Sequence, residues 1–169
     1  MIQELDDLHT RIILTSAFGL KNVADLNLQY IENGETKMRP LGNVLRDLFL
    51  YIAFRGMRKE VAFIPYLVFL YYTKKDKECL QNVRTCREFC RKLVIERKQQ
   101  MKEPGYVKHS QGDLLSTLIE DEEGFAENNE VLIDECITFF LAGSQTVKAT
   151  SANIIQHITQ KDEVRAKLF

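Results

Sequence analysis

The stretch VLIDECITFFLAGSQTVKATSANIIQHI, residues Val131 to Ile158, decides how this chain folds. Its two ends are apolar, its middle carries small and polar residues, and Asn128 or Asn129 is placed to cap its start. We predict one helix from Asn129 to Gln160, which would be about 48 Å long and would cross the whole molecule. The predicted fold class is therefore all-α, with helices packed around one long central helix.

The middle of this helix is unusual, because Ala142 and Gly143 are followed by Ser144, Gln145 and Thr146. A glycine costs roughly 1 kcal/mol relative to alanine in a helix interior. A close-packed neighbour, a kink or a flat ligand is expected to offset that cost. Ala142 and Thr146 are four residues apart and share a face, so we predict a shallow notch there with one hydroxyl at its edge.

The segment FFLAGSQTV, Phe139 to Val147, resembles the oxygen-binding motif of the distal long helix in the haem-thiolate monooxygenases, the cytochromes P-450. The family pattern is Ala or Gly, Gly, any residue, Asp or Glu, Thr, and then Thr or Ser. Gln145 replaces the usual carboxylate, and Val147 replaces the last hydroxyl residue. Both departures bear on the acid-assisted part of proton delivery.

Four flanking segments are similar to the family in the same order and spacing. They are LHTRIILTSAFG at Leu8 to Gly19, CREFCRKLVIERKQQ at Cys86 to Gln100, GDLLSTLIEDE at Gly112 to Glu122 and HITQKDEVRAKL at His157 to Leu168. Neither the family's Glu-x-x-Arg helix nor its Phe-x-x-Gly-x-x-x-Cys loop follows the predicted central helix. We therefore expect residues 1–169 to be a fragment of a single cytochrome P-450 domain, without its amino-terminal part and its haem-cysteine region.

The resemblance implies a monooxygenase that inserts one oxygen atom of O2 into a small organic or lipid-like substrate, with electrons from a reductase partner. Haem, with its iron, is the cofactor implied for the full-length parent. The family motif implies that Ala142 and Gly143 leave room for the haem plane and that Thr146 delivers protons to the reacting oxygen. Gln145 could hold a water molecule but not act as an acid.

Two further expectations concern the pocket and the iron. Phe139 and Phe140 are candidates for the substrate wall or for helix packing. No residue of this chain is expected to ligate the metal, because all four cysteines fall in predicted helices. They are Cys79, Cys86, Cys90 and Cys136. The isolated chain is therefore expected to be inactive.

Two other functions fit the same residues. A non-catalytic, all-helical interaction module would use the small-residue notch as a helix crossing. A membrane-surface module would use the apolar run Val61 to Tyr72, which has basic flanks. That run is too short to span a bilayer, which takes about 20 residues, and it could equally be a buried connection broken at Pro65. We expect an intracellular chain without a transmembrane segment or leader, and a parent at the endoplasmic reticulum membrane.

Composition agrees with one globular domain or a piece of one, with 169 residues, 45% of them hydrophobic, and a net charge of -1. The near-neutral charge gives no reason to expect a nucleic-acid partner, although Arg55 to Lys108 is basic and Ser110 to Cys136 is acidic. We expect reduced cysteines, no metal site, a surface or half-buried His9, and a loop over Lys21 to Pro40. Further helices are predicted at Gln3–Ala17, from Asn43 to Gly56, at Asp76–Lys102, at Leu114–Glu120 after an Asp113 cap, and in a final turn capped by Asp162.

Overall fold

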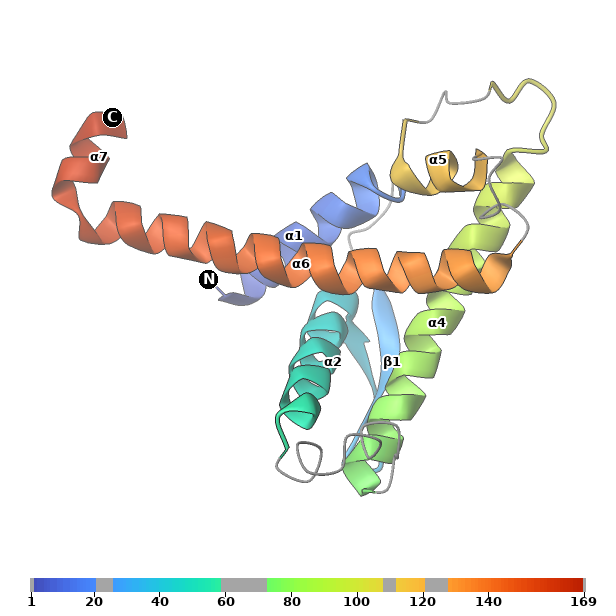
Figure 1. Cartoon of the computed structure of the whole chain (residues 1–169), viewed down its shortest axis with the longest axis horizontal. Helices are drawn as coiled ribbons and strands as arrows, with labels where there is room; N and C mark the ends of the chain where they lie inside the picture. Colours follow the sequence, from blue (N-terminus) through green and yellow to red (C-terminus); the bar gives the residue numbers. More distant parts are fainter. Residues whose placement is uncertain (1, 21–25, 59–72, 108–111, 121–127, 169) are drawn as a thin grey trace.

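The computed structural model of the chain describes residues 2–20, 26–58, 73–107, 112–120 and 128–168. The described chain is mostly helical, as the sequence predicts (Figure 1). Its elements are α1 (Ile2–Ser16), β1 (Asn27–Glu32), β2 (Glu35–Pro40), α2 (Leu41–Gly56), α4 (Lys74–Gln100), α5 (Leu114–Glu120), α6 (Asn129–Gln160) and α7 (Asp162–Leu168).

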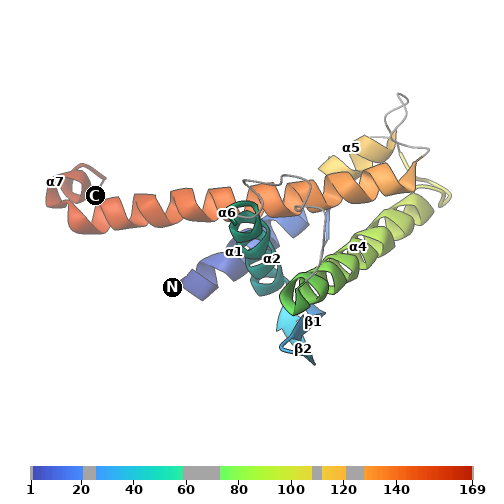
Figure 2. The same ribbon diagram turned by 60° about the horizontal axis from the view of Figure 1, so that its bottom comes forward.

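The long helix α6 is the axis of the molecule, and it has the predicted bounds. The side chain of Asn128 accepts a hydrogen bond from the Glu130 N–H at 3.0 Å, which caps the first turn. Helices α1, α2 and α4 pack against α6, whose far end projects beyond them toward α7 (Figures 1 and 2). The buried residues of α6 all lie in its first half, from Leu132 to Ser144.

The prediction of a loop over Lys21 to Pro40 is wrong for its second part, because Asn27 to Pro40 forms an antiparallel hairpin. Strands β1 and β2 are joined by Asn33 and Gly34, which have φ angles of 55° and 85°. Two residues with positive φ form the tight turn that matches the twist of a hairpin. The buried Asn82 side chain holds β1 against α4, because it accepts from the Ile31 N–H at 2.7 Å and donates to the Ile31 carbonyl at 2.9 Å.

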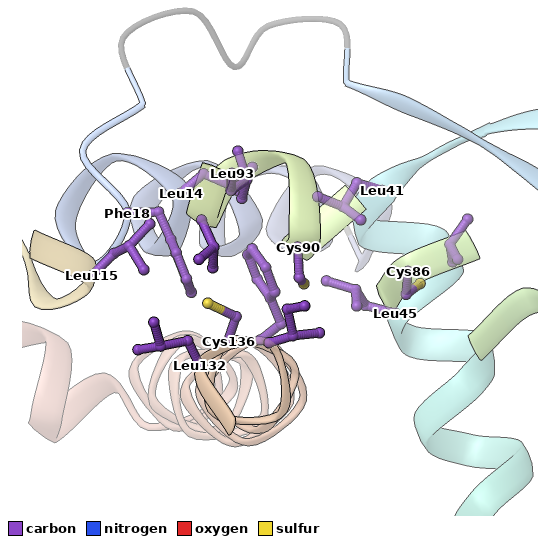
Figure 3. Packing of buried hydrophobic residues seen from close by; sticks show 14 of the residues in the cluster. Leu14, Phe18, Leu41, Leu45, Cys86, Cys90, Leu93, Leu115, Leu132 and Cys136 are labelled. Carbon is purple, nitrogen blue, oxygen red and sulfur yellow. The ribbon is translucent and has the colours of Figure 1, made fainter. Parts of the chain in front are cut away.

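One hydrophobic core lies where α1, α2, α4 and α5 meet the first half of α6 (Figure 3). Phe18, two residues after the end of α1, stacks on Phe140 of α6, with ring centroids 4.3 Å apart. The four cysteines are buried and free in the structure. Other core members are Leu14, Leu41, Leu45, Cys86, Cys90, Leu93, Leu115, Leu132 and Cys136.

Polar clamps fix the helices around that core. Buried Arg97 of α4 pairs with Asp113, and its second nitrogen donates to the Phe18 carbonyl at 2.8 Å. At the surface, Arg87 and Arg91 of the basic helix α4 each contact Glu130 at 2.8 Å. The basic and acidic stretches of the sequence therefore face each other at the α4–α6 contact.

Three other predictions concern the start of α2, the burial of His9 and the apolar run Val61 to Tyr72. Helix α2 begins at Leu41, directly after Pro40, rather than at Asn43. His9 is buried, with 5% of its surface exposed, because α1 lies against α6 there. The run Val61 to Tyr72 lies outside the described residues, and no helix in the described part of the chain is long and apolar enough to cross a membrane.

Candidate functional site

Gly143 lies where α1 crosses α6. A Cβ atom added to Gly143 would stand 3.0 Å from Cδ1 of Ile13, which is tighter than an ordinary carbon contact. The glycine therefore allows the two helices to approach closely. A close-packed neighbour, one of the three explanations offered by the sequence, accounts for a glycine inside this helix.

A second contact fixes the direction of α1 along α6. Nε2 of His9 lies 3.0 Å from Oγ of Ser151, two turns beyond Gly143. His9 and Ile13 are four residues apart and so share one face of α1. The contact between His9 and Ser151 was not predicted from the sequence. The signal available for it was that His9 and Ile13 lie on the same face of one helix.

Ala142 and Thr146 lie on a different face of α6, which the described neighbours leave exposed. Oγ1 of Thr146 donates a hydrogen bond to the Ala142 carbonyl at 2.6 Å, so the two residues form one small patch. Gln145 is half-buried beside it. The hydroxyl of Ser144 points elsewhere, because it is buried and donates to the Phe140 carbonyl at 2.6 Å. The notch thus separates into a covered glycine side and an open Ala142–Thr146 side.

The two phenylalanines differ in their surroundings. Phe140 is 2% exposed, stacks on Phe18 and lies 6.1 Å from the ring of Phe89, so it is part of the helix packing. Phe139 is half-buried and packs against the edge of the core. Phe140 and Leu141 also line a small apolar cavity of about 80 Å³ between α2, α4 and α6.

The thiols of the chain are poor ligands for iron. Burial raises the pKa of Cys79 to about 11 and the pKa of Cys86 and Cys136 to about 12, and it raises that of Cys90 as well. Since the thiolate is the form that binds metal, these buried thiols do not fit the axial position of a haem. No group of three or more metal-binding side chains occurs among the described residues. Ala142 and Thr146, by contrast, are exposed and have small side chains.

One comparison identifies the family of this chain. The described chain is mostly helical and is built on one long helix, α6. The family model for cytochrome P450 matches residues 35–169. The chain therefore belongs to the cytochrome P450 family, and its match includes the whole of α6 but not α1 or β1. A search of solved structures gives no match.

Proposed function

We propose that residues 1–169 form the oxygen-side part of a cytochrome P450 monooxygenase whose axial cysteine lies in another segment of the domain. The family match supports this proposal. The observation that carries it is the division of α6, with Gly143 packed on α1 while Ala142 and Thr146 stay exposed together. We infer that the haem plane would lie against this exposed side.

Haem, when bound, supplies the redox chemistry that activates O2. Ala142 would let the flat group approach the helix, because a methyl group is the smallest side chain that keeps the helical propensity high. Gly143 would contribute indirectly, by letting α1 hold this part of α6 in place. Phe139, at the edge of the core, remains a candidate for the wall of the substrate pocket.

Thr146 would move protons in the site. Its hydroxyl has one hydrogen to donate and two lone pairs to accept, so it can receive a proton from water while it donates its own. In the structure that hydrogen points to the Ala142 carbonyl at 2.6 Å. Turning it toward the reacting oxygen would cost about 0.5–1.5 kcal/mol, the net value of one hydrogen bond. Gln145 would orient the donating water through its amide, in the place of an acid.

The partners proposed are a small organic or lipid-like substrate, O2 and an electron-donating reductase. The cysteine-bearing segment would complete the site. The 169-residue chain alone, loaded with haem, should lack the thiolate-type spectrum that reduced P450 gives with carbon monoxide, because its thiols are buried and protonated. A thiolate-type spectrum from the chain alone would contradict the proposal that the axial cysteine lies in another segment of the domain.

The role of Thr146 is tested in a longer protein that also contains the cysteine-bearing segment. Thr146→Ala should divert electrons to hydrogen peroxide and reduce product formation by roughly 10²-fold, the lower end of what a positioned proton donor contributes. The matched control is Thr159→Ala, another exposed threonine of α6 that donates to the carbonyl four residues before it. Unchanged coupling in Thr146→Ala would favour the non-catalytic helical module.

A further inference from the structure

A second cleft lies away from the Ala142–Thr146 patch, between β1, α2 and α4. These elements stand side by side below α6 in Figure 1, and Figure 2 shows the hairpin next to α4. The volume of the cleft is about 710 Å³, within the range of roughly 300–1,000 Å³ typical of small-molecule pockets. Strand β1 precedes the residues matched by the P450 family model, so this wall lies outside the family match.

One wall of the cleft is an apolar row on α2. Leu50, Phe54 and Met57 follow each other at helical spacing and line the cleft. Their exposed fractions are 56%, 62% and 75%, which are high for large apolar side chains. A row of exposed apolar side chains beside a concave surface marks a place where an apolar group can be buried.

Three acidic residues, one from each of β1, α2 and α4, also line the cleft. Glu32, Asp47 and Glu78 line the cleft, and the described lining residues include one lysine, Lys75. Asp47 is already neutralised by an ion pair with Arg39 at 2.7 Å. The negative charge available to a ligand therefore comes from the two glutamates.

Glu78 has a binding capacity that the fold leaves unused. Its Oε2 accepts a long hydrogen bond of 3.3 Å from the Asn33 N–H of the hairpin turn. Its Oε1 is buried and has no hydrogen-bond partner among the described residues. A buried carboxylate oxygen without a donor is costly, so a donor that reaches the Glu78 carboxylate from the cleft would stabilise it.

We propose that this cleft binds a small amphipathic amine, with its apolar body along Leu50, Phe54 and Met57 and its ammonium group at Glu78. The charge on the lining favours a cation over an anion, because Glu32 and Glu78 outnumber Lys75, the one lysine among the described lining residues. An ammonium group also brings the N–H donors that Glu78 Oε1 lacks. The site does not depend on haem or on Thr146, so it stands or falls independently of the proposed monooxygenase role.

The test is a calorimetric titration of the 169-residue chain with three probes of similar shape, which are 2-phenylethylamine, 2-phenylethanol and 3-phenylpropionate. We expect saturable binding of the amine, at least roughly tenfold weaker binding of the alcohol, and none of the carboxylate. Glu78→Gln should weaken amine binding by at least roughly tenfold and leave alcohol binding unchanged. Glu96→Gln, an exposed glutamate of α4 outside this cleft, is the matched control.

The apolar wall has its own control pair. Phe54→Ala should weaken the amine and the alcohol by similar factors, whereas Ile95→Ala, at an exposed apolar residue of α4, should change neither. Circular dichroism of each variant checks that the helices are retained. The proposal is overturned if the amine does not saturate, if it binds no better than the alcohol, or if Glu78→Gln behaves like Glu96→Gln.

Discussion

Replacing Asp113 with alanine should be among the most destabilising single changes in this chain. Asp113 is 4% exposed and its Oδ2 accepts from Arg97 Nη1 and from the Ser116 hydroxyl. Its Oδ1 accepts from the Ser116 N–H at 2.9 Å, which caps α5. Arg97 in turn donates to the Phe18 carbonyl. One carboxylate thus connects α4, α5 and the end of α1.

The size of the effect follows from what the substitution leaves behind. Arg97 is 6% exposed, so without Asp113 it becomes a buried charge with no counter-ion at that position. Removal of one partner of a buried ion pair costs about 3–5 kcal/mol. Loss of the α5 cap adds about 1 kcal/mol. The total of about 4–6 kcal/mol compares with a typical domain stability of about 5–15 kcal/mol.

Urea denaturation of the whole chain, followed by far-ultraviolet circular dichroism, measures this loss. Asp113→Asn should retain most of the cap and lose the charge, so the two variants should differ by about 1 kcal/mol. Lys37→Ala removes an exposed ion pair with Glu35 and should leave the unfolding midpoint unchanged. If Asp113→Ala costs less than about 1 kcal/mol, the size of a helix cap alone, the clamp does not hold these helices together.

Two further predictions concern ionisable groups. Burial acts to raise the pKa of Asp76, but hydrogen bonds from Tyr51 and Thr73 outweigh it and lower the pKa from 3.8 to about 2. The ionised carboxylate therefore stabilises the fold above about pH 4, and this contribution is lost as the pH falls toward 2. In Asp76→Asn, the free energy of unfolding should change less between pH 4 and pH 2 than in the unsubstituted chain. An equal change in both proteins would contradict this prediction. Burial raises the pKa of Cys86 and Cys136 to about 12, so few of these thiols are ionised at about pH 8. Iodoacetamide at that pH should therefore alkylate the folded chain slowly and the urea-unfolded chain fully, as measured by mass spectrometry. Rapid alkylation of these two cysteines in the folded chain would contradict this prediction.

Helix α6 could be predicted from the sequence because its signals are local. Asn128 caps it, the apolar spacing continues to Gln160, and the structure gives the same bounds. The hairpin was missed because Lys21 to Pro40 is rich in polar residues. Its signal was the Asn33–Gly34 pair, since those two residue types favour the positive φ angles of a two-residue turn.

The site was predictable only in part, for a physical reason. Helical spacing shows that Ala142 and Thr146 share a face, but it does not show which neighbour covers the next face. Ile13 is far from Gly143 in the sequence, and the close approach between them depends on how α1 and α6 cross. The burial of His9 has the same origin, because its partner Ser151 lies on α6.

The division of α6 into a covered and an uncovered half bears directly on the proposed chemistry. A helix in water is stabilised mainly by the packing of its apolar face, and the buried residues of α6 end at Ser144. Beyond that point Val147 and Ile154 are 50% and 54% exposed, although their apolar character suits a buried surface. Thr146 lies at the boundary between the two halves. In the proposed monooxygenase, Thr146 would therefore act at the edge of the packed core, where its hydrogen bond to the Ala142 carbonyl at 2.6 Å fixes the position of its hydroxyl.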